Sequence, residues 1–433
     1  MSFLESFFKI EQQGSTIRKE VIAGVSTFLT MAYIMVANPA ILSDAGMDFS
    51  SVFVATIIAA AVGTLIMGLW ANWPVALAPG MGLNAFFAYG VVLGSDLTWP
   101  EALATVLISG IAFAILSLVG VRTWLTNNIP LSLRQAISVG IGFFLAFIGL
   151  RNAGIIVDNP ATLVSLGDIH SPAIWLAALG LILMVTLEYL RVLGGVIISI
   201  LAVSALGWIF GLHEFQGIVG AVPSIEPTLL QIDISRIAEP LFISTAFAFL
   251  FVDFLDTVGT LTSVATVAGK TDETGKIKNI GGAVMSDSLS TVLGSMLGTS
   301  TVTSYIESGV GIREGGRTGL TAVVISVLFL LCLFFSPLAL SIPSFATAPA
   351  LIFVATFFVS GMAKIDWQNL TESLPALLIM LVMPLSYSIA GGLAAGFAAY
   401  AVLKLCTGRR HELNPATITL AALSLLYLLL GHS

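Results

Sequence analysis

The chain has 433 residues, of which 57% are hydrophobic and only 9% are charged, with a net charge of -7. A mean hydropathy of +1.02 is too apolar for a soluble globular protein, so the composition excludes that class and calls for a lipid bilayer as the solvent. Helices are expected rather than a membrane β-barrel, because the uncharged stretches of about 20 residues do not alternate polar and apolar side chains.

The first half of the chain begins with a segment of scattered charges and continues with seven apolar runs. Residues 1–20 lack a cleavable leader pattern and predict a short interfacial helix with Leu4, Phe7, Phe8 and Ile10 on one side. We expect residues 21–211 to form a first repeat of seven membrane spans. The runs lie near residues 21–42, 51–70, 75–94, 101–120, 131–150, 172–190 and 192–211.

A polar break separates this half from a second set of apolar runs. Residues 212–240 are acidic and are expected to form an extracytoplasmic linker, followed by a second repeat at 241–433. Eight runs lie near residues 241–261, 279–297, 298–312, 319–337, 347–362, 374–389, 391–405 and 416–430. Because only the sequence IAGG interrupts residues 374–405, the pattern leaves open whether this stretch is one span or two.

The distribution of positive charges indicates the orientation. With the amino terminus in the cytoplasm and residues 374–405 counted as two spans, only Arg151 and Arg236 fall on the outer side, as the positive-inside rule predicts for a correct orientation. Seven spans in the first half make the second half start from the opposite side of the membrane. This is the requirement for two inverted repeats of the transporter kind.

Two segments at corresponding positions of the halves are too rich in small and polar residues for lipid-facing helices. The first reads VALAPGMGLNAFFAYG and contains Asn84, and the second reads GTSTVTSYIESGVGIREGG and contains Glu307. Paired interrupted spans predict a binding site near the middle of the membrane. The alternative is two ordinary packing helices, because small residues also let helices approach closely.

The predicted membrane interior contains four carboxylates, Asp253, Asp256, Asp287 and Glu307, but no Lys or Arg. A charged side chain at the centre of a bilayer costs about 2.5 to 3.5 kcal/mol. Each carboxylate therefore needs a proton, a sodium ion, hydroxyl or amide groups, or a substrate that offers N–H donors. Small-solute binding and translocation is the function that this pattern favours.

The four acids differ in their sequence surroundings. Asp253 and Asp256 stand three residues apart, so they share a helix face and can act as a proton-binding pair. Either could instead cap a broken helix or bond a neighbour, an alternative that is stronger for Asp253. Asp287 is surrounded by serines and a threonine, which favours a structural hydrogen-bond network.

The interrupted segments supply further candidates for substrate binding. Glu307 has Tyr305 and Ser308 beside it, where free backbone N–H groups could share the site. Asn84 can both donate and accept hydrogen bonds, and the following Phe86 and Phe87 could stack on a flat ligand. Core or lipid contact is the more common role of such phenylalanines.

At VALAPGMGLNAFFAYG, FVDFLDTVGTL, GTSTVTSYIESGVGI and GGRTGLTAVV the chain closely resembles the AzgA-like purine permeases of the nucleobase-cation symporter family 2. The resemblance runs from residues 14–34 to residues 367–376. It implies about 14 spans in two inverted repeats, core and gate domains, and short strand-plus-helix segments as spans 3 and 10. It also implies proton-coupled uptake of adenine, hypoxanthine or guanine.

By their positions in these motifs, Asn84, Asp256 and Glu307 resemble the binding-site residues of the family. Some members of the family lack an acid at the position of Asp253. We therefore treat Asp253 as a candidate determinant of which purine is preferred, and an aspartate there favours adenine. The expected partners are a purine base and the bilayer of the cell membrane, with a homodimer left open and no nucleic acid, metal or cofactor. The coupling ion is expected to be H⁺, and Na⁺ is not excluded.

Two rival functions are weighed against this interpretation. An anion exchanger of the same fold should offer positive charge or bare helix N-termini, and the acids found here argue against it. An intramembrane aspartyl protease would need aspartates on different spans with a GxGD motif. The chain has no such motif, and Asp253 and Asp256 share one predicted helix.

Overall fold

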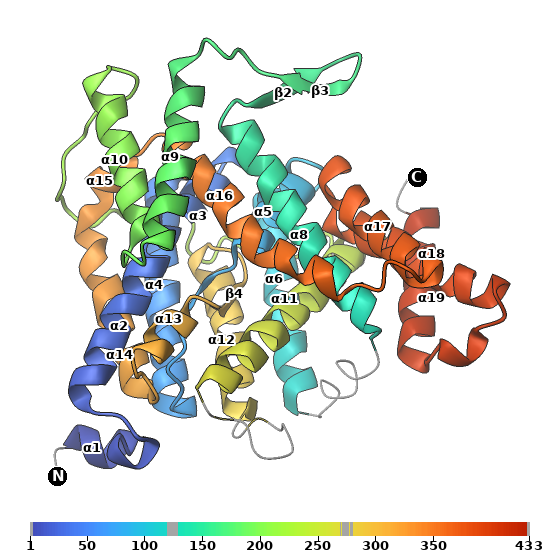
Figure 1. Ribbon diagram of the computed structural model, residues 1–433, viewed down its shortest axis with the longest axis horizontal. Coiled ribbons are helices and arrows are strands. Elements are labelled where there is room, and N and C mark those ends of the chain that lie inside the picture. Colours follow the sequence, from blue (N-terminus) through green and yellow to red (C-terminus); the bar gives the residue numbers. More distant parts are fainter. Residues whose placement is uncertain (1–2, 119–128, 269, 271–276, 278–279, 431–433) are drawn as a thin grey trace.

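The computed structural model describes residues 3–118, 129–268, 270, 277 and 280–430, and its regular structure is almost entirely helical (Figure 1). Within these ranges, eight helical segments are long and apolar enough to cross a bilayer. Four shorter apolar helices accompany them. The prediction of a helical protein that crosses the membrane many times is therefore confirmed.

The first half begins with a short helix and continues through longer helices and short strands. The side chain of Thr16 accepts a hydrogen bond from Lys19 N at the start of the helix that begins at Ile17. The side chain of Asp48 accepts one from Ser51 N at the start of the helix that begins at Phe49. The elements are α1 (Phe3–Phe8), α2 (Ile17–Met31), α3 (Ile34–Asp44), α4 (Phe49–Ile66), η2 (Met67–Ala71), β1 (Leu77–Pro79), α5 (Met81–Ala85), η3 (Phe86–Val92), α6 (Trp99–Leu118), α8 (Leu131–Asn152), β2 (Ile156–Asn159), β3 (Leu163–Leu166), α9 (Pro172–Tyr189) and α10 (Gly195–Ile209).

The second half answers the question that the sequence left open at residues 374–405. The chain turns at Tyr387, which has a positive φ of 52°, and Ser388 caps the next helix through Gly391 N, so this stretch forms two helices. The elements are α11 (Pro240–Val267), α12 (Ile280–Leu297), β4 (Val302–Ser304), α13 (Ser308–Arg313), α14 (Gly319–Leu331), η4 (Cys332–Phe335), α15 (Ser336–Leu340), α16 (Ser344–Val359), η5 (Ser360–Lys364), α17 (Leu370–Leu385), α18 (Ile389–Cys406), η6 (Arg410–Glu412) and α19 (Pro415–Leu430).

The two interrupted segments meet as a pair of short strands. Strands β1 and β4 are antiparallel, with Ala78 opposite Thr303 at their centre. The Gly80 N–H extends the pairing by donating to the Thr301 carbonyl at 3.0 Å. Backbone that leaves a helix inside a membrane must find hydrogen-bond partners within the protein, and each strand supplies them for the other. The predicted strand-plus-helix segments are confirmed.

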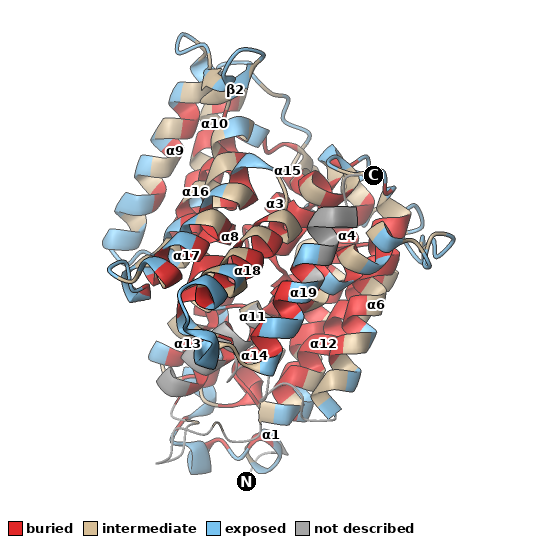
Figure 2. Cartoon of the chain, turned by 90° about the vertical axis from the view of Figure 1, so that its right-hand side faces the viewer, coloured by how far each residue is buried: buried red, intermediate tan, exposed pale blue. Residues whose placement is uncertain are grey.

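The helices pack as two groups that face each other. A first helical group consists of α2–α6 with α11–α14, and within it α12 packs against α4 and α6 while α14 packs against α2 and α4. A second helical group consists of α8–α10 with α16–α19, and in it α8 lies along α16 and α17. Buried residues concentrate in α4, α6 and α12, whereas α9 carries many exposed residues (Figure 2). Each group is thus a distinct helical bundle.

Candidate functional site

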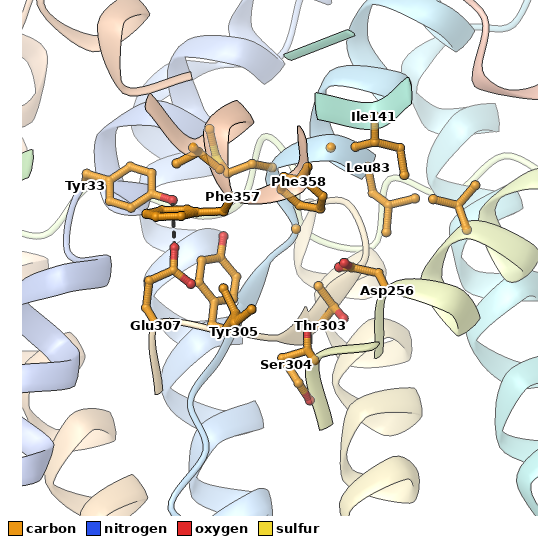
Figure 3. A pocket seen from close by; sticks show the side chains of 17 residues that line it. Tyr33, Leu83, Ile141, Asp256, Thr303, Ser304, Tyr305, Glu307, Phe357 and Phe358 are labelled. Atoms are coloured by element: carbon orange, nitrogen blue, oxygen red, sulfur yellow. Dashed lines mark hydrogen bonds between the residues drawn. The ribbon is translucent and has the colours of Figure 1, made fainter. Parts of the chain in front are cut away.

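A small cavity of about 100 Å³ lies between the two helical groups, beside the crossing of β1 and β4 (Figure 3). The first group contributes the segments around both strands and one face of α11. The second group contributes apolar side chains of α8 and α16. The lining residues are Tyr33, Gly80, Met81, Gly82, Leu83, Ile141, Val252, Asp256, Thr260, Thr303, Ser304, Tyr305, Ile306, Glu307, Val354, Phe357 and Phe358.

Two carboxylates from different elements enter this cavity. Asp256 reaches it from α11, and Glu307 reaches it from the residue that immediately precedes α13 (Figure 3). The residues that line the cavity include no Lys or Arg. A site with two carboxylates and no fixed cation can accept hydrogen bonds from a ligand or take up a proton.

Two tyrosines form hydrogen bonds in the cavity wall around Glu307. The hydroxyl of Tyr33 donates to Glu307 Oε1 at 3.4 Å, and Tyr33 stands where the chain passes from α2 to α3. The hydroxyl of Tyr305 donates to the carbonyl of Pro79 at 2.5 Å. Because Pro79 ends β1 and Tyr305 follows β4, this bond joins the two interrupted segments at the cavity wall.

Asp287 lies outside the cavity, in a buried network of hydroxyl groups. Its Oδ1 accepts from the backbone N–H and the hydroxyl of Ser304, at 2.8 and 2.7 Å. Its Oδ2 accepts from the hydroxyl of Thr257 at 2.8 Å. The carboxylate thereby ties α12 to β4 and α11, a geometry that fits the structural role expected for it.

Asp253 is turned away from the cavity, although it stands only three residues before Asp256. It is 1% exposed, and the Thr291 hydroxyl on α12 donates to its Oδ2 at 3.3 Å. Its Oδ1 has no hydrogen-bond partner among the described residues. Helical spacing alone suggested a carboxylate pair at one site, but the packing of α12 draws Asp253 toward the hydroxyl network.

Asn84 and Ser308 lie at the strand crossing, behind the cavity wall. Asn84 is fully buried, and its Oδ1 accepts a hydrogen bond from the Ser300 hydroxyl. Its Nδ2 is without a partner in the part of the chain that the structure describes. The Ser308 hydroxyl accepts from Ala76 N at 3.0 Å. Neither side chain is among the residues that line the cavity, and both lie next to residues that do.

The aromatic residues at the cavity differ from those that the sequence indicated. Phe86 and Phe87 pack against Phe249 of α11, with ring centroids 4.9 and 6.4 Å apart, and neither lines the cavity. The π-helical turn η3 directs both rings into the core, which corrects the expectation that they form a stacking surface here. The rings that do face the cavity include Phe357 and Phe358 (Figure 3).

Sequence reasoning also missed Tyr33, a lining residue whose polar hydroxyl stands in the middle of an apolar run. That isolated hydroxyl was a usable sign, because a buried Tyr O–H needs a hydrogen-bond partner. No comparable sign marked Phe357 or Phe358, which lie in an ordinary apolar helix, α16. Their position depends on how the second helical group docks against the first.

The permease family Xan_ur_permease matches residues 18–395 of the sequence. The chain belongs to this permease family. It is 46% identical to "Adenine permease AdeP" of Escherichia coli, over 98% of this chain and 95% of that protein. It is 44% identical to "Guanine/hypoxanthine permease PbuG" of Bacillus subtilis, over 98% of this chain and 99% of that protein.

Among solved structures, the chain is similar to the transmembrane domain of a cyanobacterium bicarbonate transporter, BicA. The TM-score is 0.68 over 92% of this chain and 98% of that domain, with 13% sequence identity, so the likeness shows the fold alone. The family match confirms the resemblance found in the sequence. This permease is an integral membrane protein of the nucleobase permease family, and its relatives are transporters rather than enzymes.

Proposed function

We propose that this permease takes up purine nucleobases into the cell together with protons, with adenine as the preferred substrate. The observation that carries the proposal is the entry of two carboxylates, Asp256 and Glu307, into one cavity without a cationic side chain. Purines are flat, and they offer ring and exocyclic N–H donors that carboxylates can accept. The relatives named above as adenine and guanine/hypoxanthine permeases support the same substrate class.

In the proposed binding mode, the purine lies between the strand crossing and α16. Asp256 and Glu307 accept N–H bonds from its polar edge, while Phe357 and Phe358 pack against its face (Figure 3). One of the two carboxylates takes up a proton from the outer side and releases it inside, which couples uptake to the proton gradient. Asn84 supports the site through the strand crossing.

The preference for adenine rests on weaker grounds. Asp253 was the sequence feature that suggested it, yet its carboxylate contacts Thr291 of α12. We therefore assign Asp253 an indirect effect, exerted through the hydroxyl network that positions α11 and β4. The identities to an adenine permease and to a guanine/hypoxanthine permease are similar, 46% and 44%, so the uptake measurement below decides between these bases.

Transport further requires that the cavity open alternately to the two sides of the cell membrane. We assign the first helical group as the core domain and the second as the gate domain, related through two inverted repeats of seven spans. Relative movement of the two groups would change the access of the cavity, because residues of both groups line it. The distribution of positive charge supports a cytoplasmic amino terminus.

The rival functions are disfavoured by the residues at the site. An anion such as bicarbonate would meet two carboxylates and no Lys or Arg in the cavity, which is electrostatically unfavourable. An intramembrane protease would need two aspartates aimed at one point. Asp253 and Asp256 belong to a single helix, α11, and only Asp256 lines the cavity.

Uptake of radiolabelled adenine, hypoxanthine and guanine by a permease-deficient strain tests the proposal. We expect Glu307→Gln and Asp256→Asn each to lower the uptake rate at least about tenfold, since each removes a charged acceptor whose hydrogen bond is worth about 1.5 to 3 kcal/mol. Glu314→Gln is the matched control, because Glu314 is exposed at the end of α13. Wild-type rates in both site variants would refute the assignment.

Ion coupling is tested in the same cells. A protonophore should abolish accumulation of the base, while replacement of Na⁺ by choline should leave the initial rate unchanged. The opposite pattern would assign Na⁺ as the coupling ion and refute proton symport, without affecting the assignment of the substrate class.

A further inference from the structure

A second cavity, of about 260 Å³, lies at the other end of the interface between the helical groups. It shares no lining residue with the central cavity. Its polar lining consists of Asp44 on α3, Asn152 on α8, and Ser344 and Thr347 on α16. The full lining is Ala37, Ala40, Ile41, Asp44, Asn152, Ser344, Thr347 and Leu351. We call it the outer cavity.

A chain of hydrogen bonds fixes the polar side of the outer cavity. The hydroxyl of Tyr89, on η3, donates to Asp44 Oδ2 at 2.6 Å. The amide of Asn152 donates to the Tyr89 oxygen at 3.0 Å. In the part of the chain that the structure describes, no hydrogen bond reaches Asp44 Oδ1. One carboxylate oxygen is thus held in place while the other is free to accept from a ligand.

Helices α8 and α16 line both cavities at different heights, and α3 runs from the residue after Tyr33 to the outer cavity. Helix α3 begins next to Tyr33 of the central cavity and ends at Asp44, and α8 carries Ile141 and Asn152 in the corresponding places. Eleven residues of helix separate the members of each pair, a rise of about 16 Å. The outer cavity therefore lies along the axis of α3, toward the end of the molecule opposite the amino terminus (Figure 1).

A layer of apolar residues separates the two cavities. Ile34 of α3 and Leu145 and Ile148 of α8 lie between the lining positions of their helices, and all three are 0% exposed. On the far side of this layer Asp44 is exposed, so solvent reaches the outer cavity directly. A solute that enters from that side meets the outer cavity before the packed layer.

We propose that the outer cavity is a second binding site for a purine base, occupied before the apolar layer opens toward the central cavity. The inference rests on the proposed function and adds a staging point to it. Asp44 Oδ1 accepts a ring or exocyclic N–H, and the amide of Asn152 bonds the neighbouring polar edge. Ala37, Ile41 and Leu351 supply an apolar wall for the ring.

The shape and lining favour a planar organic solute over a bare cation. A bound metal ion needs oxygen ligands on several sides, whereas half of the residues that line the outer cavity are apolar: Ala37, Ala40, Ile41 and Leu351. The hydroxyls of Ser344 and Thr347 come from α16, and the carboxylate of Asp44 comes from α3. These hydroxyls can complete the hydrogen bonds of a small polar ring that spans the cavity.

Equilibrium binding of radiolabelled adenine to the purified full-length protein in lipid nanodiscs tests the inference. The wild-type isotherm should resolve two sites. Asp44→Ala should weaken the lower-affinity site about 10- to 100-fold, because it removes a charged hydrogen-bond acceptor, and should leave the tighter site in place. Glu307→Gln should do the reverse. Asp168→Ala is the matched control, because Asp168 is an exposed acid that lines neither cavity.

Two milder variants keep the test decisive if Asp44→Ala does not fold. Ser344→Ala and Thr347→Val each remove one hydroxyl from the outer cavity, and both should weaken only the lower-affinity site. If the wild-type isotherm shows a single site and Glu307→Gln abolishes it, the outer cavity is not a purine site. The proposed function would be unaffected by that result. Absence of adenine binding to the wild-type protein, together with absence of uptake, would instead refute the proposed function.

Discussion

The hydroxyl of Ser308 accepts a hydrogen bond from the backbone N–H of Ala76 at 3.0 Å. The Tyr305 N–H donates in turn to the Ala76 carbonyl at 2.9 Å. These bonds join the start of α13 to the residue that precedes β1, although the two segments stand far apart in the sequence. Because Glu307 lies between Tyr305 and Ser308, its position in the cavity depends on both interrupted segments at once.

Loss of the Ser308 hydroxyl should therefore destabilise the strand crossing. In Ser308→Ala the buried Ala76 N–H loses its acceptor, which costs about 1 to 3 kcal/mol. We expect a lower melting temperature in detergent and a reduced uptake rate. Ser360→Ala is the control, since Ser360 is exposed and bonds only within its own turn. An unchanged melting temperature in Ser308→Ala would contradict the role given to this contact.

Two glycines in the short helix α13 should respond in opposite ways to the same substitution. A Cβ at Gly311 would come within 2.3 Å of Thr27 Oγ1 and 2.4 Å of the Ala23 carbonyl oxygen. Gly311→Ala should thus push α13 away from α2, costing about 1 to 3 kcal/mol and displacing Glu307. A Cβ at Gly309 would meet nothing within 4 Å.

Uptake and melting temperature of the two alanine variants give the comparison. Gly309→Ala should keep wild-type uptake and gain up to about 1 kcal/mol from helix propensity. Equal effects of the two substitutions would show that the contact between α13 and α2 does not control the site.

The hydrogen bond between Tyr33 and Glu307 should contribute to substrate affinity. Tyr33→Phe keeps the ring at the cavity and removes only the hydroxyl that donates to Glu307 Oε1. A net contribution of about 0.5 to 1.5 kcal/mol corresponds to a rise in the KM for uptake of about two- to tenfold. Tyr189→Phe is the control because Tyr189 is 87% exposed. A KM equal to that of the wild type would show that the Tyr33 hydroxyl does not contribute to substrate affinity.

Lys404 forms a buried ion cluster that the sequence analysis did not identify. Its Nζ lies 2.7 Å from Glu372 and 2.5 Å from Glu412, and its side chain is 0% exposed. Lys404→Met would leave the largely buried Glu372 without its cation, a change that costs about 3 to 5 kcal/mol. We expect a large loss of thermal stability in detergent. The exposed Lys364 provides the control variant Lys364→Met, which should melt as the wild type does.

The same cluster predicts a pH dependence of stability. The hydrogen bond from Lys404 lowers the pKa of Glu412, in the loop after α18, below its ordinary value of 4.5. Since the folded pKa lies below the unfolded one, the contribution of Glu412 is present above pH 4.5 and disappears as the pH falls through the folded pKa. The melting-temperature difference between wild type and Glu412→Gln should shrink over that range. A difference independent of pH would contradict this linkage.

Much of the architecture followed from local properties of the sequence. Apolar runs of membrane-spanning length predict helices, because a bilayer leaves backbone few other ways to satisfy its hydrogen bonds. The two breaks rich in Gly, Ser and Thr predict interrupted spans, and the resemblance to the purine permeases implied the short strands within them. The turn at Tyr387, which divides residues 374–405 into two helices, could not be predicted from hydropathy. Its positive φ is a local backbone property that an apolar run does not reveal.

At the site, the sequence by itself determined that carboxylates would stand in the membrane interior and that Glu307 belonged to an interrupted span. Tertiary packing decided which carboxylates share a cavity. Asp256 faces Glu307, whereas Asp253 is drawn to Thr291 and Asp287 to Ser304. The physical reason is that a spacing in the sequence sets only the face of a helix. The partner of that face depends on neighbouring helices distant in the chain.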